Sequence, residues 1–571
     1  MKGPQPPRVH AIKPVFPSIQ EFPIRLLDRF FPKRRHRVLL LLGYYFFWIL
    51  AFVLVKHKST IATEVEGFGR PSSIGCGYSN WAPGNSCGVN GNDCRPFNGT
   101  GFAFRCPSNC KNHHVLNPRA VGSFEAIYQP LVIGGPSDDD ERPIYRSDSF
   151  VCGAAIHAGI IDNNNGGCGV VALIGAHRKY QSSKRNGIES IGFDSDFPSS
   201  FAFYPTVNCE ATDARWQLLY ISVIFSAVFS LFTTSGPIFF FTIFVVTFVH
   251  VGLASDPPLT NSTVAALVSN LLGKFLPSMF IAIVMYRYMG VRRTLTGLTA
   301  QIEKTVLWLG ACWVGALTNY TLDFIPIQRL NKHDLDQQPG ARAALAFIII
   351  VLASIFAQQI WYFRQEGRLI RYLGIYGILI ASILISLAIP ALNLRIHHYI
   401  LALLLLPGTS MQTRPVLLYQ GLLIGLFVNG IARWGFDPVL QTSGSLQGDA
   451  QYDSSLPITR SPDITLGQNA SSISFSWIDP PEPFDGISVL VNDVERFRGY
   501  TDEGLPSDKQ FVWTQSPNIV DPQYFRFAYM QGSQSWDYTR AGVWSPNGAW
   551  VPMPPGPSRV KSRSLERDFL S

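Results

Sequence analysis

The sequence predicts a polytopic α-helical membrane protein of about nine transmembrane helices with two extramembrane β-rich domains. Of its 571 residues, 47% are hydrophobic and only 15% are charged, whereas globular domains usually have about 25% charged residues. Apolar runs long enough to cross a bilayer recur along the chain. Two long polar stretches separate or follow these runs, and the first of them holds eight of the nine cysteines.

Residues 1–37 form a Pro-rich, basic N-terminal segment. It ends in four basic residues, Lys33, Arg34, Arg35 and Arg37. The apolar run 38–55 follows at once, and no small-residue cleavage site comes after it. We therefore expect a retained signal anchor with a cytosolic N-terminus. The same cytosolic bias explains the net charge of +8 better than nucleic-acid binding does, because the basic residues flank apolar runs.

Residues 56–215 form a polar, cysteine-rich domain. Its cysteines are Cys76, Cys87, Cys94, Cys106, Cys110, Cys152, Cys168 and Cys209. An even set within one soluble segment predicts disulfide bonds and an oxidising compartment. The sequon at Asn98, a predicted glycosylation site, agrees with this compartment.

Eight further apolar segments lie between residues 216 and 433. They are 216–233, 237–254, 264–286, 305–322, 344–363, 373–391, 399–411 and 416–432. If all of them cross, the total is odd and the C-terminus lies outside, and basic residues such as Arg293, Arg368 and Arg414 then fall in cytosolic loops. Segment 399–411 is short and contains Pro407, so a re-entrant path that leaves the C-terminus in the cytosol is the alternative.

A linker, 434–456, leads into a second β-rich domain at 457–552. Alternating residues and turn signals in ISFSWIDPPEPFDGISVLVNDVERFRGY and QYFRFAYMQGSQSWDYTRAGVW predict short strands and tight connections. Trp477 and Tyr524 occupy positions that a β-sandwich would bury, and the pattern resembles a fibronectin type III domain. The sequon at Asn469 predicts a second glycosylation site and favours an external position. The end, 553–571, is predicted to be disordered.

One stretch of the cysteine-rich domain, YRSDSFVCGAAIHAGIIDNNNGGCGVVALIG, carries a specific resemblance. With CPSNC before it and RNGIES after it, it resembles the LCCL domain of cochlin and Limulus factor C over roughly 94–207. A multi-pass chain with this module is similar to the fungal LCCL domain-containing membrane proteins. The resemblance implies a helix wrapped by antiparallel sheet.

The resemblance also implies disulfide pairing. Cys110 would bond to Cys152, and Cys106 to an upstream cysteine, for which Cys94 is the first choice. Outside the family pattern, a Cys168–Cys209 bond would tie the Gly-Gly turn to the last strand. Cys76 and Cys87 remain as the fourth pair.

Two features of this domain invite functional hypotheses. His157 has small neighbours that suit close helix–sheet packing, so a buried, hydrogen-bonded structural histidine is preferred over a catalytic one. The loop HRKYQSSKR is basic and would attract sulfated glycans or anionic lipid head groups, although a solvated loop is the simpler interpretation. Its candidate binding residues are Arg178, Lys179, Lys184 and Arg185.

Polar residues also gather at the predicted outer ends of several helices. The set is His250, Asp256, Asp323, Arg395, His397 and His398. Ionisable groups at membrane depth usually face the bundle interior, and zinc takes imidazole and carboxylate ligands. The inventory resembles in kind the alkaline ceramidase and adiponectin receptor hydrolases, but their His-x-x-x-His pair is absent. A polar lipid pocket and interfacial anchoring are the alternatives to a metal site.

The leading functional hypothesis is recognition. The chain would be anchored in the secretory pathway or plasma membrane and present its two β-rich domains to the lumen or exterior, where they bind glycan, cell-wall polysaccharide or membrane lipid. The alternative is an intramembrane metal-dependent lipid hydrolase that uses the His/Asp set, which would require zinc. A transporter is third, suggested by Lys274 within an apolar segment. An enzyme is the less favoured class, and no cofactor is predicted.

Overall fold

The computed structural model describes most of the chain in two compact units, which we describe separately. The described residues are 7–60, 64–137, 140–205, 207, 209–255, 264–327, 330, 335–336, 338–390, 392–442, 455–467, 470–501, 510–515 and 521–556. The helical unit comprises 1–60, 214–330 and 339–443. The second unit, which we call the head, comprises 61–213, 331–338 and 444–571.

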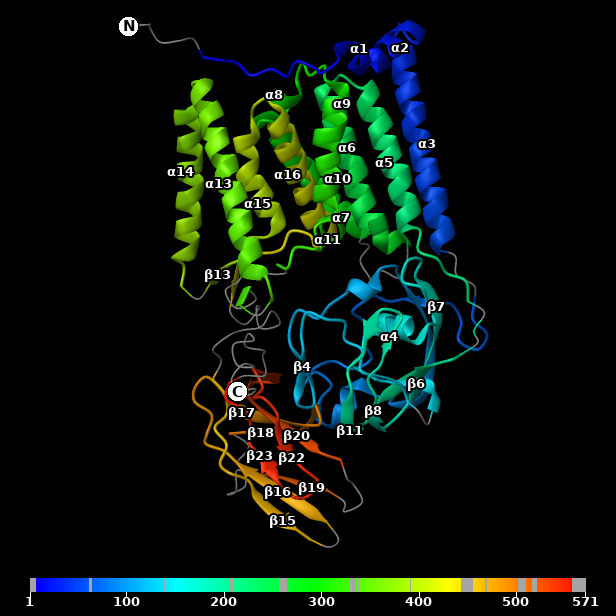
Figure 1. The fold of residues 1–571 in the computed structure, drawn as a ribbon, viewed down its shortest axis with the longest axis vertical. Helices are drawn as coiled ribbons and strands as arrows, with labels where there is room; N and C mark the ends of the chain where they lie inside the picture. Colours follow the sequence, from blue (N-terminus) through cyan, green and yellow to red (C-terminus); the bar gives the residue numbers. More distant parts are fainter. Residues whose placement is uncertain are drawn as a thin grey trace. The chain divides into compact units, whose positions relative to one another are not determined.

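Seven helices of the helical unit are long and apolar enough to cross a membrane by length and composition, within the described part of the chain. They are α3 (Arg34–Thr60), α5 (Arg215–Phe232), α6 (Gly236–His250) with its π-helical continuation η3 (Val251–Ser255), α7 (Val264–Tyr288), α13 (Ala341–Gln365), α14 (Leu369–Leu387) and α16 (Arg414–Arg433). In Figure 1, α14 and α13 form one edge of this bundle and α3 the other.

The other two predicted spans form shorter helical pieces. Segment 305–322 consists of η4 (Lys304–Leu309), α10 (Gly310–Ala316) and α11 (Thr318–Thr321). Segment 399–411 consists of α15 (His398–Leu405) and a 3₁₀ turn, η5 (Leu406–Thr409). Pro407 lies in this turn; its ring and missing N–H do not suit an α-helix interior. Within the residues that it describes, the structure thus has seven long helices where the sequence predicted about nine spans.

Glycines set the closest helix contact of this unit, between α10 and α16. A Cβ added at Gly421 would overlap the carbonyl oxygen of Trp308, and one at Gly425 would overlap that of Cys312. Gly315 meets the backbone of α16 at Leu422 in the same way. Small residues spaced by four on one face let two helix backbones approach closely. Most of the side chains of α16 are consequently buried.

Shorter elements complete the helical unit. They are α1 (Pro17–Gln20), α2 (Phe22–Phe30), α8 (Val291–Leu295), α9 (Gln301–Glu303) and the strand pair β13 (Leu392–Leu394) and β14 (Leu440–Thr442).

The cysteine-rich domain, residues 64–213 of the head, is built on one sheet of order β1-β2-β7-β12-β6-β5. Its strands are β1 (Ser72–Ser73), β2 (Asn98–Cys106), β5 (Gly134–Ser137), β6 (Asp140–Arg146), β7 (Gly167–Ile174) and β12 (Ser200–Phe203). Helix α4 (Val151–Ala158) packs in the same core as this sheet, with every residue except Ala158 buried. His157 is buried and hydrogen-bonded, as predicted: Nδ1 lies 2.8 Å from the hydroxyl of Tyr145 and Nε2 lies 3.1 Å from the carbonyl oxygen of Ser183.

Short elements surround that sheet. They are η1 (Val89–Cys94), η2 (Cys110–Asn112) and three antiparallel pairs, β3 (Arg119–Val121) with β4 (Phe124–Ala126), β8 (His177–Tyr180) with β11 (Phe193–Phe197), and β9 (Lys184–Arg185) with β10 (Ile188–Glu189).

Four disulfides staple this domain, and three of the four predicted pairs are wrong. The bonds are Cys76–Cys110, Cys87–Cys94, Cys106–Cys152 and Cys168–Cys209. Only Cys168–Cys209 was predicted.

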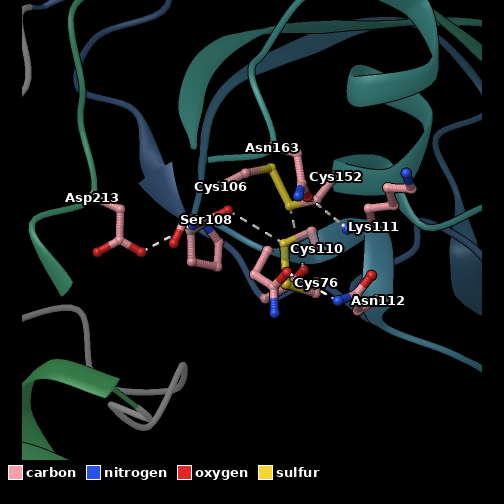
Figure 2. The surroundings of a disulfide bond; sticks show 12 residues. Cys76, Cys106, Ser108, Cys110, Lys111, Asn112, Cys152, Asn163 and Asp213 are labelled. Carbon is pink, nitrogen blue, oxygen red and sulfur yellow. Dashed lines mark hydrogen bonds between the residues drawn. A yellow bond between two sulfur atoms is a disulfide. The ribbon is translucent and has the colours of Figure 1, made fainter. Parts of the chain in front are cut away.

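The roles of Cys106 and Cys110 are exchanged relative to the expectation. Cys106 ends β2 and reaches Cys152 at the start of α4, with their Cα atoms 5.7 Å apart. Cys110 follows in the turn η2, whose backbone is held by a hydrogen bond from the Lys111 N–H to Asn163, and it meets Cys76 instead (Figure 2). The ninth cysteine, Cys312, is free and buried in the helical unit.

The C-terminal domain, the described residues from 455 to 556, consists of two antiparallel sheets with one shared core. The smaller sheet has the order β15 (Asp463–Leu466), β16 (Ser471–Ser476), β19 (Gln510–Gln515). The larger has the order β18 (Val494–Tyr500), β17 (Gly486–Val491), β20 (Gln523–Gln531), β22 (Gly542–Trp544), β23 (Trp550–Val551), with β21 (Gln534–Ser535) beside β20. Phe475 of the first sheet and Phe527 of the second lie within that core. Trp477 and Tyr524 are buried, as predicted.

Candidate functional site in the head

A hairpin tip of the C-terminal domain is built into the cysteine-rich domain. Val491 pairs with Val494 across the two-residue turn Asn492-Asp493, and both turn residues have positive φ, 53° and 63°. Asn and Asp tolerate this backbone better than other non-glycine residues, and such turns suit the twist of a hairpin. The turn therefore presents a carboxylate and an amide at the end of a rigid ribbon.

Asp493 forms a buried ion pair with Arg146. Its Oδ2 accepts hydrogen bonds from Arg146 Nη1 and from the Gly122 backbone N–H, each at 2.8 Å. Arg146 also donates to both carboxylate oxygens of Asp148, at 2.8 and 2.6 Å, and its guanidinium lies over the ring of Phe193. Burial lowers the pKa of Arg146, but the carboxylates of Asp148 and Asp493 outweigh it and raise that pKa above its usual value. Arg146 thus stays charged inside the head.

Further contacts extend this seam between the two domains. The Tyr524 hydroxyl donates to Asp194 at 2.7 Å, and the Asn492 amide donates to Asp196 at 2.8 Å. Arg526, which is 1% exposed, donates to the Gly122 carbonyl oxygen at 2.6 Å. Apolar side chains of both domains also belong to one core cluster. Two domains that are separated in sequence by most of the helical unit, residues 214–443, therefore form one head.

A small pocket opens beside this seam. It has a volume of about 70 Å³ and is lined by Trp81, Arg119, Asp148, Phe150 and Asp493, among others. Asp148 and Asp493 are already paired with Arg146. Nothing in the sequence marked Arg146 or Asp493 as partners; the sequence predicted only short strands and tight connections in this part of the chain.

The predicted basic loop is exposed and forms two strand edges. Arg178 and Lys179 lie on β8, and Lys184 and Arg185 form β9. Two of the four contact carboxylates: Lys179 Nζ lies 3.6 Å from Asp521, and Lys184 Nζ lies 3.9 Å from Glu189. Both lysine side chains are at least 70% exposed, so these contacts are weak surface pairs.

Lys179 also lines a shallow hollow together with His177 of the same strand and Arg142 of β6. Arg142 is exposed. The structure therefore adds Arg142 to the predicted basic set and places cationic side chains of two strands around one hollow. The hollow has a volume of about 10 Å³, room for about one water molecule, so its cationic side chains form a rim at the surface and do not enclose a cavity.

The helix-end polar set is not brought together among the described residues. Asp256 lies outside them. His250 is 1% exposed and its ring contacts Phe52 and Trp313. Asp323 is exposed. No group of three His, Cys, Asp or Glu residues in the described part of the chain could hold a metal ion.

The two adjacent histidines do not both lie within a helix. His397 has extended backbone (φ −74°, ψ 159°) and precedes α15, which begins at His398. His397 Nδ1 lies 3.9 Å from Asp437 and its Nε2 lies 3.3 Å from the Pro438 carbonyl oxygen, whereas His398 is exposed. Arg395 bonds to Gln441 at 3.4 Å. These residues therefore contact the segment that leads into β14, and none of the described residues forms a metal-ligand group with them.

The lysine that suggested transport has a local role. Lys274 Nζ donates to the carbonyl oxygen of Arg433 at 2.9 Å and lies 3.4 Å from that of Ala432. Both carbonyls end α16, where the last C=O groups have no partner within the helix. Lys274 thus caps a helix.

Comparison with known proteins agrees with this architecture. Residues 84–201 match the LCCL domain family, close to the predicted range of 94–207. The Saccharomyces cerevisiae protein named "Uncharacterized protein YIL067C" is 31% identical to this chain. Their alignment, 598 residues long, covers 95% of this chain and 86% of the yeast protein. The chain belongs to the family of this yeast protein. No solved structure matches it. An LCCL domain stapled by disulfides and several long apolar helices together indicate a membrane protein of the secretory pathway.

Proposed function

We propose that this chain is a membrane-anchored recognition protein whose head binds an anionic group on a glycan or lipid. The observation that carries the proposal is the hollow lined by Arg142, His177 and Lys179. Arg178 lies on the same strand as His177 and Lys179, and its side chain is exposed. Lys and Arg near a negatively charged surface contribute about 1 kcal/mol each, so a few of them give measurable, salt-dependent binding.

The shared core of the head supports a lumenal or extracellular position for both β-rich domains. Domains that pack together lie on the same side of the membrane, so the chain between them crosses an even number of times. The basic cluster before α3 favours a cytosolic N-terminus, and one crossing by α3 then places the head outside. If segment 399–411 were re-entrant and the other eight predicted segments crossed, seven crossings would lie between the two domains. An odd number would place the domains on opposite sides of the membrane, so this topology is disfavoured.

We also propose that the C-terminal domain is fibronectin type III-like. Its sheet order supports this: three strands, β15, β16 and β19, face a sheet led by β18, β17, β20 and β22. Sandwiches of this kind commonly present binding loops at their ends.

The binding proposal is tested with the full-length protein in neutral detergent, on arrays of sulfated glycans and phosphoinositides. Arg142→Ala combined with Lys179→Gln, which removes both fully charged side chains that line the hollow, should weaken binding about 30-fold, as two surface cations contribute about 1 kcal/mol each. Arg460→Ala, which removes an exposed arginine of the C-terminal domain, is the matched control and should change little. Equal binding by both variants, or no binding to any anionic probe, contradicts the proposal.

The intramembrane hydrolase gains no support from the geometry, because His250, Asp323 and the 397–398 pair lie in different surroundings. The outcome that would revive it is zinc, in stoichiometric amount, in the purified protein.

A further inference from the structure

The helices that precede the first long helix carry an apolar face that nothing in the helical unit covers. Phe22, Leu26 and Phe30 recur every four residues along α2, which places them on one helix face, and Ile19 lies in the short helix α1 just before it. In that order, the four side chains are 61%, 36%, 65% and 59% exposed. No residue of α2 is buried. Isolated exposed apolar residues are ordinary, but a continuous stripe of this size marks a binding surface.

The opposite side of α2 is charged and ties the helix to α3. Asp28 forms an ion pair with Arg37, in the first turn of α3, at 2.7 Å. The Nε of Arg37 also donates a hydrogen bond to the Phe31 carbonyl oxygen at 2.6 Å. Arg25 and Arg29 are exposed on α2. With the basic run at residues 33–35, they make this end of the chain strongly cationic.

The segment before α1 is also fixed. The Val15 N–H donates to Glu303 at 2.8 Å, and the Gln20 amide donates to the same carboxylate at 2.9 Å. Arg414, at the start of α16, holds that carboxylate at 2.6 Å. Farther back, the Ile12 N–H bonds to Gln412 at 3.3 Å. The N-terminal segment, expected only to be a basic tail, is therefore a strap across helix ends.

We propose that α2 lies in the plane of the membrane surface and binds anionic lipids. Helix α3 is long and apolar enough to span the bilayer and begins at Arg34, so α2, four residues earlier, sits at the depth of the lipid head groups. Its apolar stripe enters the acyl boundary while Arg25 and Arg29 contact lipid phosphates, the usual arrangement of an interfacial amphipathic helix. The occupant of the stripe is thus a lipid surface, selected by its negative charge.

The test uses the full-length chain in nanodiscs with a bimane label attached to one introduced cysteine. Cys312→Ser removes the free thiol. Lipids brominated in the acyl chain should quench a label at Leu26→Cys and leave a label at Asp28→Cys, about 200° around the helix on the charged side, nearly unquenched. Replacing phosphatidylserine by phosphatidylcholine should lower quenching at position 26 about twofold, because surface charge contributes part of the binding.

Arg25→Gln with Arg29→Gln supplies the matched charge control. In this background, the label at position 26 should be quenched equally in anionic and neutral discs. Equal quenching at positions 26 and 28 overturns the proposal, because the helix would then have no lipid-facing side. So does an unquenched position 26, which would leave the stripe for a protein partner.

Discussion

The head and the helical unit are held together by different kinds of contact. The head buries charge: Arg146 is fully buried between Asp148 and Asp493, and four disulfides lock the surrounding chain. The helical unit makes a close backbone contact where Gly421 lets α16 touch η4 and Gly425 lets it touch α10. Its outer helices expose apolar side chains. In α14, Tyr372 is the only buried residue.

The difference follows from the solvent of each unit. In water, burial of apolar side chains drives folding, and a buried ion pair adds a geometric requirement that only one docking satisfies. In lipid, the exterior is as apolar as the core, so close backbone contact and hydrogen bonds must distinguish the right helix pair. Each unit is therefore sensitive to a different kind of substitution.

The largest effect is expected where the head loses a buried charge. Arg146→Met leaves two carboxylates without their partner and should destabilise the head by about 3–5 kcal/mol. Limited proteolysis of the full chain in increasing urea measures this. Arg178→Met, on an exposed strand edge, should leave the midpoint unchanged. A shift equal in both variants would mean that the seam does not hold the head together.

Loss of a disulfide should cost nearly as much. Cys152→Ser and Cys106→Ser should each destabilise the cysteine-rich domain by about 2–5 kcal/mol, and the double variant should be no worse than either. Cys110→Ser should instead release the thiol of Cys76. Mass spectrometry of alkylated peptides reads the pairing directly, and a free Cys110 thiol in Cys152→Ser would restore the pairing first expected from the sequence.

Glycine substitution should separate the inner helices from the outer ones. Gly425→Ala places a methyl group against the Cys312 carbonyl and should cost about 1–3 kcal/mol by overpacking. Gly374→Ala on α14 has nothing within 4 Å of the new Cβ and should be neutral or slightly stabilising. Reaction of Cys312 with a thiol-activated dye during heating reports unfolding of this unit. Equal shifts for the two variants would argue against the α10–α16 contact.

A smaller effect is expected from His157, through pH. Burial lowers its pKa below the usual 6.5, although the hydrogen bond to Ser183 opposes this. The unfolded chain then binds a proton more readily than the folded one, so the stability contributed by His157 is lost as the pH falls below about 6.5. His157→Gln should flatten the decline in urea midpoint between pH 7 and pH 5. An unchanged slope would show that other groups cause the decline.

The last prediction concerns sidedness and should not affect stability. Asn98 is exposed on β2, and Asn469 lies outside the described residues. Because their two domains form one head, both should carry N-linked glycan, and Asn98→Gln and Asn469→Gln should each abolish one shift in gel mobility after glycosidase. Access of a cytosolic protease to the C-terminal domain in sealed vesicles would contradict a shared external head.

The sequence by itself determined the local features of this protein. Apolar runs located the seven long helices, the stretch around Cys152 and His157 carried the resemblance to the LCCL domain, and alternation with turn residues indicated short strands in the C-terminal domain. Each of these signals lies within one element or one short stretch, where periodicity and backbone preference act.

Only the tertiary structure decided which distant residues meet. Cys106 and Cys110 lie four positions apart, and the direction of the turn at η2 determines which of them reaches α4. Asp493 and Arg146 belong to domains that lie before and after residues 214–443 in the sequence. The N-terminal segment, expected to be a tail, donates backbone hydrogen bonds to Glu303, Gln412 and Glu366. Such pairings depend on the arrangement of whole elements in space. A carboxylate or thiol looks the same in the sequence whichever partner it finds.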